Sequence, residues 1–420
     1  MNEFENFIMN NITSGRIGEI SDVLRAFYNQ KPSDLPPEAK LSILSQVMQI
    51  SPADIDEIIA SHSEVSRTVK GHAFEVVFDT MMAANGIKCI EVGGDTDVDR
   101  VINNYSLQLK TPYVAGCSDD IVSYKTHKTH GAKSEIESMD YYHRYSDFAD
   151  FLVGLVSYNP FQVLIVPKNE LPSAKHSIAH IESPMYLDAN NIHWLNKFSA
   201  LGIRKQLQFP QRLLRVSSNE CLPLSSKLLD LPSDFILRAI FLEDNFRIWD
   251  MNMRGFIREH ELSKTLASHH IKTYPPYVTQ RERYDKCDLV LKTVNGSFIR
   301  FQVKGLTWKT TIARRYLYID CESQLSRGRV NDHPTQSRLY LADDFEYLII
   351  AVDPPYTNIL SYNTFHTHDY NWSFYCIPTS DLRKHPSYPN RIFSHQIISY
   401  RDLQHYRIGN EWFNLWKKEL

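Results

Sequence analysis

The sequence predicts a mixed α/β fold in which one α/β module occurs twice, after an N-terminal helical region. Two observations lead to this expectation: helical patterns are followed by short strands, and short matches recur in the same order in both halves of the chain. A chain of 420 residues is long enough for two or three domains. We place a helical N-terminal region at 1–62, module 1 at 63–200, a linker or helical segment at 201–250, and module 2 at 251–420.

Caps and turns indicate the first elements. Ser51-Pro52 is a good helix start, with proline near the first turn, and Asn85-Gly86 ends the helical pattern as a left-handed cap would. Asn103-Asn104 fits the tight turn of a β-hairpin. The expected helices cover 36–49, 51–84 (allowing one break) and 233–269, and the expected strands cover 87–92, 98–102, 105–109, 150–156 and 162–166.

An internal repeat supports the tandem arrangement. Each copy contains a helical Gly and Glu, then an Ile-Lys pair, a strand that opens with Asp, and a strand that carries Gln-x-Lys. The offset between copies grows from 184 to 211 along the chain, which indicates loop insertions in the second copy while the order of elements is kept. The matched segments are 70–75 with 254–259, 87–88 with 271–272, 99–102 with 288–291, 107–110 with 301–304, 147–148 with 344–345, and 166–167 with 377–378.

The repeated positions carry residue types that suit phosphodiester chemistry. Residues two apart on a strand face the same side of a sheet, so the Gln and Lys of each Gln-x-Lys segment share a face. The hairpin partner brings the Asp alongside, so that an acid, an amide carbonyl oxygen and an ammonium converge, and the helix Glu can complete a metal shell. The candidate catalytic residues are Glu75, Asp99, Gln108, Lys110, Glu259, Asp288, Gln302 and Lys304, and all except the two lysines are candidate metal ligands.

Hard oxygen ligands of this kind suit Mg²⁺, or Mn²⁺. In phosphodiester hydrolysis such an ion neutralises the phosphate and lowers the pKa of a bound water, while a lysine holds or activates that water. Asp97 and Asp285 lie near the chosen aspartates and are alternative ligands. A single strand lysine would more simply extend to solvent. The matched Asp and Glu in both copies favour the catalytic interpretation.

The order Glu, Asp, Gln-x-Lys resembles the motif of the PD-(D/E)XK nuclease superfamily, which includes many type II restriction endonucleases. The resemblance covers roughly 63–170 and 250–382. It implies two tandem restriction-endonuclease-like modules, each a central mixed sheet flanked by helices, with a divalent metal and cleavage of nucleic acid. The chain departs from the usual pattern at Gln108 and Gln302, where the superfamily usually has Asp or Glu, and a neutral ligand binds metal more weakly.

Polar, basic stretches follow each of the two lysines, and such side chains near a cleft hold phosphates and read base edges. Two hypotheses follow. The first is a metal-dependent endonuclease of restriction or host-defence type that acts on double-stranded DNA, as a monomeric pseudo-dimer or as a homodimer. The second is a non-catalytic DNA-binding or scaffold protein on a degenerate nuclease fold. The candidate DNA contacts are Lys125, Lys128, Lys309, Arg314, Arg315, Arg327 and Arg329.

Composition bounds these hypotheses without deciding between them. The net charge of −3 neither favours nor excludes DNA. The sequence shows no long apolar run, no signal-peptide pattern and no CxxC pair, so we expect a cytoplasmic protein with free thiols and no membrane segment. The absence of GxxxxGK[ST] argues against an ATP-driven motor. His127, His130 and 366–369 are interpreted as surface or core residues, because no Cys ligands or HExxH pattern accompany them.

Overall fold

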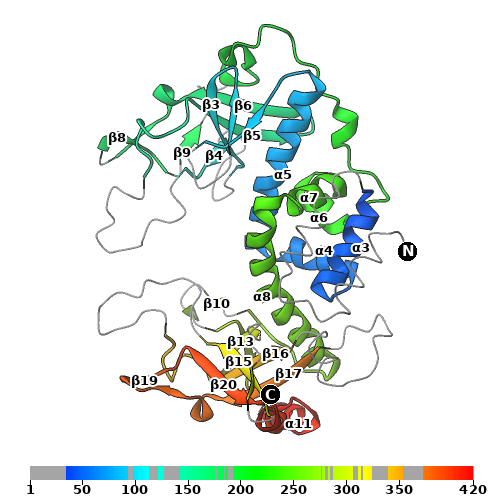
Figure 1. The fold of residues 1–420 in the computed structure, drawn as a ribbon, viewed down its shortest axis with the longest axis vertical. Coiled ribbons are helices and arrows are strands. Elements are labelled where there is room, and N and C mark those ends of the chain that lie inside the picture. Colours follow the sequence, from blue (N-terminus) through cyan, green and yellow to red (C-terminus); the bar gives the residue numbers. More distant parts are fainter. Residues whose placement is uncertain are drawn as a thin grey trace. The chain divides into compact units, whose positions relative to one another are not determined.

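The chain is a mixed α/β protein of helices and several sheets, as expected from the sequence (Figure 1). It divides into two compact units, of which one contains residues 55–249 and the other contains 43–54 and 250–420. The computed structural model describes residues 35–92, 98–112, 122–126, 142–175, 177–183, 185–187, 193–275, 277–279, 282–283, 287–305, 311–313, 316–323, 339–352 and 372–419.

The helices that precede the first sheet in the chain begin and end near the expected caps. Helix α3 (Pro37–Met48) ends at Gln49, which has a positive φ of 56°. The long helical pattern is broken at His62, between α4 (Pro52–Ser61) and α5 (Ser63–Ala84), and Gly86 with φ 63° follows the end of α5.

The predicted single helix over 233–269 is wrong. It forms two helices, α7 (Ser233–Ile240) and α8 (Glu243–Ser268). The junction contains no Gly or Pro that would signal a break. Phe241, which follows α7, is buried, so the break coincides with tertiary packing that the local sequence does not signal. The predicted strand over 87–92 is also shorter than expected, because only Ile90–Glu91 pairs as β1.

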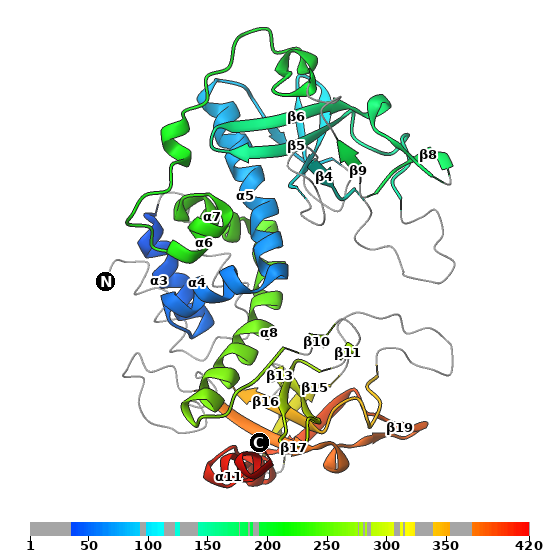
Figure 2. The same ribbon diagram turned by 180° about the vertical axis from the view of Figure 1, so that it is seen from behind.

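The sheet of module 1 has the strand order β1-β2-β3-β5-β6. Strands β3 and β5 run parallel, and every other neighbouring pair is antiparallel. The β2–β3 turn is Asn103-Asn104, and both residues have positive φ (49° and 68°), as a two-residue hairpin turn with matching twist requires. Figure 2 shows α5 beside strands β5 and β6. The remaining strands are β2 (Arg100–Ile102), β3 (Tyr105–Lys110), β5 (Phe151–Tyr158) and β6 (Phe161–Pro167).

The sheet of module 2 repeats this topology. Its order is β12-β13-β16-β17, and β13 and β16 are again the parallel pair. An isolated bridge from Tyr274 to Val290 stands where β1 pairs with β2 in module 1. The same order and the same strand directions confirm the internal repeat. The strands are β12 (Leu289–Lys292), β13 (Phe298–Gly305), β16 (Tyr347–Val352) and β17 (Ser373–Pro378).

Small antiparallel ladders accompany both central sheets and are also duplicated. In module 1, β4 (Val122–Tyr124) pairs with β9 (Met185–Leu187), and β7 (Ser173–Ala174) pairs with β8 (Ser177–Ile181). Their counterparts in module 2 are β15 (Tyr316–Glu322) with β20 (His395–Ser399), and β18 (Lys384–His385) with β19 (Tyr388–Ile392). The other elements are α6 (Pro223–Leu229), β10 (Tyr277–Thr279), β11 (Glu282–Arg283), β14 (Thr311–Ala313), α10 (Tyr400–Leu403) and α11 (Asn410–Glu419).

The two cores are built from matching positions. Phe148 of module 1 and Phe345 of module 2 are both buried just before the central parallel strand. The following strand adds Leu152 in one copy and Leu348 in the other. Burial of such aliphatic and aromatic side chains stabilises each module by about 1.5–3 kcal/mol per residue. The equivalence of the two cores therefore extends the repeat beyond the motif residues.

At one pair of facing core positions, the large and the small side chain are interchanged between the two copies. Gly154 faces the ring of Tyr124, and a Cβ at this glycine would lie 2.4 Å from the Tyr124 Cζ atom. In module 2 the corresponding residues are Ile350 and Cys321, both buried in one apolar cluster. A large side chain on one strand is thus matched by a small one on the other in each copy, which keeps the packing density constant.

We expect Gly154→Ile to destabilise the protein by about 3 kcal/mol, because the new side chain must displace a fully buried ring. The double variant with Tyr124→Cys reproduces the Ile–Cys pair of module 2 and should recover part of that loss. Urea unfolding of the two single variants and the double variant measures the coupling. Strictly additive effects would show that the two side chains do not share one packing site.

Candidate active site

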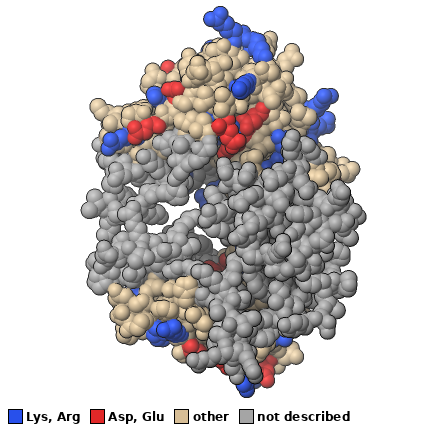
Figure 3. All heavy atoms as spheres, in the orientation of Figure 1, with Lys and Arg blue, Asp and Glu red and all other residues tan. Residues whose placement is uncertain are grey.

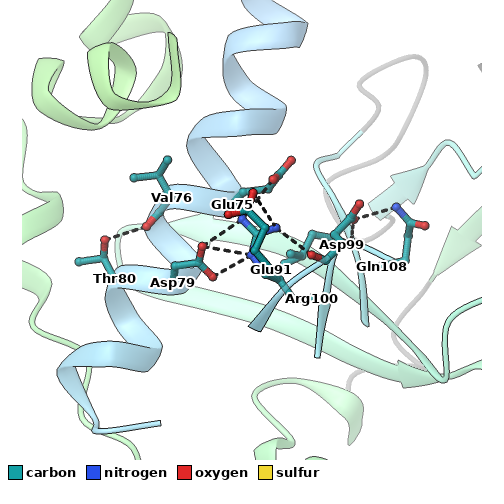
Figure 4. A network of polar contacts seen from close by, with 9 residues as sticks. Glu75, Val76, Asp79, Thr80, Glu91, Asp99, Arg100 and Gln108 are labelled. Carbon is teal, nitrogen blue, oxygen red and sulfur yellow. Dashed lines mark hydrogen bonds and ion pairs between the residues drawn. The ribbon is translucent and has the colours of Figure 1, made fainter. Parts of the chain in front are cut away.

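The predicted hairpin site of module 1 is formed. Asp99 precedes β2, and its backbone N–H donates a hydrogen bond to the Leu107 carbonyl (2.8 Å). Its carboxylate oxygen Oδ2 accepts two hydrogen bonds, from the Gln108 side-chain amide Nε2 (2.7 Å) and from the Leu109 backbone N–H (2.6 Å) (Figure 4). The hairpin ladder therefore places the Asp carboxylate directly over the Gln-x-Lys strand.

The predicted site of module 2 has the same contacts. The Asp288 backbone N–H donates to the Phe301 carbonyl (2.8 Å), and Asp288 Oδ2 accepts from the Val303 backbone N–H (2.9 Å). The Gln302 side-chain amide Nε2 also donates to Asp288 Oδ2. Gln302 is 1% exposed and Gln108 is 5% exposed, so both amides are enclosed. Two segments with different flanking sequences thus build one local geometry twice.

The two strand lysines share these sites with the aspartates. Lys110 is the last residue of β3, and Lys304 lies at the corresponding place in β13, each two residues after its Gln. Burial raises the pKa of Asp99, and the charge of Lys110 acts in the opposite direction. Burial also raises the pKa of Asp288, which the charge of Lys304 opposes. Each lysine is therefore close enough to its aspartate to interact with it electrostatically.

Glu75 on α5 joins the site of module 1. Its Oε2 accepts a hydrogen bond from the Arg100 Nη2 group (3.3 Å). The pKa of Glu75 is raised to about 7, first by burial and then by the nearby charge of Asp99, while the charge of Arg100 acts in the opposite direction. A carboxylate on the helix and a carboxylate on the hairpin therefore lie in one electrostatic environment, as the metal-shell hypothesis requires.

Glu259 is placed less directly by the structure. It is half-buried on α8, one residue after Arg258. The Arg258 guanidinium lies against Gly305, the last residue of β13, where a Cβ would stand 2.1 Å from the Arg258 Cζ atom. Helix α8 therefore passes the end of the Gln-x-Lys strand of module 2. The assignment of Glu259 as a metal ligand stays a prediction.

Most of the predicted DNA contacts lie outside the described residues. Lys125 is half-buried just after β4. On the face that Figure 3 shows, the described Lys and Arg side chains are spread among acidic ones and form no continuous basic patch. The residues outside the described ranges are Lys128, Lys309, Arg314, Arg315, Arg327 and Arg329, together with the alternative ligands Asp97 and Asp285 and the histidines His127, His130, His366 and His368.

Two residues near the sites escaped the sequence analysis. Arg100 follows Asp99 directly and binds Asp79 on α5 (Nε to Oδ1, 3.0 Å). Tyr340 is buried in module 2, with its ring centroid 5.7 Å from the Lys304 Nζ atom. Arg100 could have been noticed as a charged residue within a short apolar strand. Tyr340 has no local signal, because its approach to Lys304 depends on long-range folding.

The donor set of module 1 fits a hard divalent cation. Asp99 and Glu75 offer carboxylate oxygens, and Gln108 offers an amide oxygen, which are the ligand types that Mg²⁺ and Mn²⁺ prefer. The Gln108 amide nitrogen faces Asp99, so its oxygen faces away, as Figure 4 shows. A cation held by both residues would therefore require the amide to rotate by about half a turn.

A second acidic cluster is an ion-pair network. Asp54, His260 and Glu261 lie together, but the Lys264 ammonium donates to both oxygens of Asp54 (2.8 and 2.9 Å). His260 Nε2 lies 3.2 Å from the same carboxylate. Lys264 already neutralises Asp54, so these residues are explained as ion-pair partners of Asp54.

No protein-family model and no curated protein matches this chain. Among solved structures, the chain is similar to a bacterial homing endonuclease, I-Ssp6803I. The identity is 14%, the match covers 39% of this chain and 90% of that chain, and the TM-score is 0.21. A TM-score this low does not establish a shared fold. Among the described residues, no helix is long and apolar enough to span a membrane.

The raised pKa of Glu75 predicts a pH-dependent stability. The ordinary value of 4.5 applies to the unfolded chain, and the folded value is about 7, so the folded protein binds the proton more tightly. The free energy of unfolding should fall as the pH rises from about 4.5 to about 7, by up to about 3 kcal/mol.

Urea unfolding of the wild type and of Glu75→Gln across this pH range measures the effect. The variant should lose this part of the slope, because its side chain does not titrate. Equal slopes for both proteins would place Glu75 in a more solvated environment than the structure gives it.

Proposed function

We propose that this protein is a metal-dependent DNA endonuclease of restriction or host-defence type. The observation that carries the proposal is the duplicated site. In both modules an Asp carboxylate accepts hydrogen bonds from the Gln side chain and from the backbone N–H of the Gln-x-Lys strand, with a Lys two residues beyond the Gln. A single site of this kind is a common strand contact. Its repetition with the same donors and acceptors favours a shared chemical role.

The residues of each site divide the work of phosphodiester hydrolysis. A bound Mg²⁺ or Mn²⁺ would supply charge neutralisation at the phosphate and an acidified water. In module 1, Asp99 and Glu75 would supply carboxylate oxygens as metal ligands, and Gln108 would supply a neutral amide oxygen. Lys110 orients the attacking water and stabilises the negative charge that develops on the phosphate. The enclosed position of Gln108 restricts bulk water at this point.

One strand of the duplex is assigned to each module. The two strands of DNA are related by two-fold symmetry, so enzymes that cut both strands usually supply two equivalent sites. A tandem chain supplies two sites without dimerising, and a homodimer would supply them if only one module were active. The loop insertions of module 2 make the halves unequal, which suits an asymmetric recognition sequence.

Incubation of the purified protein with supercoiled plasmid and Mg²⁺ or Mn²⁺ tests the proposal. Cleavage should require the added ion, stop with a chelator, and disappear in the double variant Asp99→Asn with Asp288→Asn. Digestion of unmodified phage DNA then separates specificity classes, since discrete bands indicate sequence recognition and a smear indicates none. Ion-independent cleavage, or cleavage by the double variant, would contradict the assignment.

The glutamines favour a second candidate function. In both sites the amide nitrogen fills the place beside the Asp carboxylate, which is a stable arrangement without metal. The protein would then bind DNA, or serve as a scaffold, on a degenerate nuclease fold. DNA binding that persists with a chelator, together with intact plasmid under all metal conditions, would favour this candidate.

A further inference from the structure

Arg100 forms a clamp between the hairpin of module 1 and helix α5. Its side chain is 3% exposed. The guanidinium binds Asp79 through Nε (3.0 and 3.1 Å) and through Nη2 (3.0 Å), and the same Nη2 also donates to Glu75 (3.3 Å). Nη1 donates to the Asp99 backbone carbonyl (2.8 Å). The buried guanidinium of Arg100 thus contacts both the Glu75 carboxylate on the helix and the Asp99 backbone carbonyl on the hairpin, as Figure 4 shows.

The clamp has a physical task at this site. Glu75 and Asp99 are two carboxyl groups in one half-buried environment, and they repel each other when both are ionised. Arg100 offsets that repulsion and holds Glu75 through Oε2 alone, so Oε1 is outside this bond. Asp79 receives three of the guanidinium contacts, and it therefore fixes Arg100 while Glu75 receives one.

The positions of module 2 that align with Arg100 and Asp79 carry other residues. Leu289 follows Asp288 and pairs with Phe301, as Arg100 follows Asp99 and pairs with Leu107. Leu289 is buried in an apolar cluster. The offset that aligns Glu75 with Glu259 aligns Asp79 with Ser263, whose hydroxyl accepts a hydrogen bond from Thr273 (3.0 Å). The two sites therefore share the hairpin geometry, but the positions that align with Arg100 and Asp79 carry uncharged residues in module 2.

We infer that Arg100 is a positioning residue that holds Glu75 beside Asp99 for a divalent cation in module 1. The inference rests on the proposed function. With Glu75 fixed by Arg100, module 1 offers Mg²⁺ or Mn²⁺ a second carboxylate in a defined place. Loss of Arg100 should therefore weaken the binding of these ions in module 1.

Isothermal titration calorimetry with Mn²⁺ tests each site separately. Asp288→Asn removes an anionic ligand from module 2 and leaves the site of module 1, while Asp99→Asn does the converse. The Asp288→Asn protein, which keeps the site of module 1, is the background for the next variants. In that background Arg100→Leu, which installs the residue of module 2, should weaken binding by about tenfold or more. Asp79→Asn should weaken it in the same direction, because Asp79 anchors Arg100.

Arg238→Leu is the matched control. Arg238 is also an arginine that contacts α5, through Thr80, but its partners Thr80, Asp234 and Phe235 are not candidate metal ligands, so the Mn²⁺ affinity should not change. Thermal unfolding of every variant verifies the fold. If Arg100→Leu fails to fold, Asp79→Asn carries the test instead.

A double-mutant cycle distinguishes positioning from a general structural role. In a Glu75→Ala background, Arg100→Leu should change the Mn²⁺ affinity by no more than about twofold, because the residue through which Arg100 acts is gone. Equal weakening in both backgrounds would overturn the inference and leave the proposed function intact. Absence of Mn²⁺ binding in both single-site proteins would overturn the metal-dependent function together with the inference.

Discussion

Lys110→Ala is expected to convert supercoiled plasmid to nicked circles and to stop there. Lys110 lies beside Asp99 at the end of β3, and Lys304 lies in the same position of the other module. Removal of an electrostatic group that acts on the transition state costs about 10²-fold or more in rate, which is about 2.7 kcal/mol. The strand assigned to module 1 should then remain intact on the timescale of the assay.

Lys304→Ala should give the same product with the opposite strand cut, and strand-specific end labelling distinguishes the two. The double variant should leave the plasmid supercoiled, and DNA binding should survive in all three proteins. If Lys110→Ala still linearises plasmid at the wild-type rate, module 1 is structural and the active enzyme requires a second chain. If either single variant abolishes all nicking, the sites are coupled and the model of one strand per module fails.

Gln108→Glu is expected to change stability and metal affinity in opposite directions. The amide of Gln108 donates to Asp99, whereas a glutamate would place a second carboxylate against it in an enclosed site. Loss of a charge-assisted hydrogen bond costs about 1.5–3 kcal/mol, so the protein without metal should unfold at lower urea concentration. Saturating Mg²⁺ or Mn²⁺ should restore much of the loss, because a bound ion would offset the repulsion between the two carboxylates.

The Mn²⁺ affinity of Gln108→Glu should rise by about tenfold, which corresponds to about 1.4 kcal/mol. Gln108→Leu is the control, since it removes the same hydrogen bond without adding a ligand. It should be destabilised but gain nothing from the ion. A Gln108→Glu protein that is as stable as the wild type without metal would show that the amide contact with Asp99 contributes little. One that binds Mn²⁺ no more tightly would remove residue 108 from the metal shell.

The local parts of both sites could be predicted from the sequence, because they depend on short-range geometry. Asn103-Asn104 forms a two-residue turn since both residues tolerate positive φ, and this turn sets the register that brings Asp99 over Gln108. The spacing of Gln and Lys follows from the two-residue period of a strand. The order of matched segments likewise predicted the duplicated sheet, because insertions lengthen loops without changing strand order.

The tertiary structure alone decided which side chains meet across long separations. Nothing near Arg100 in the sequence indicates that it would bind Asp79, because that contact depends on how α5 lies against the hairpin. The exchange of Tyr124 and Gly154 for Cys321 and Ile350 is equally invisible locally, since only the summed volume of facing strands is constrained. The sequence by itself thus determined the repeated motif and its topology. Burial and the pairing of distant charges decided that Arg100 joins helix α5 to the hairpin of module 1, because buried charges require partners that only the folded chain brings together.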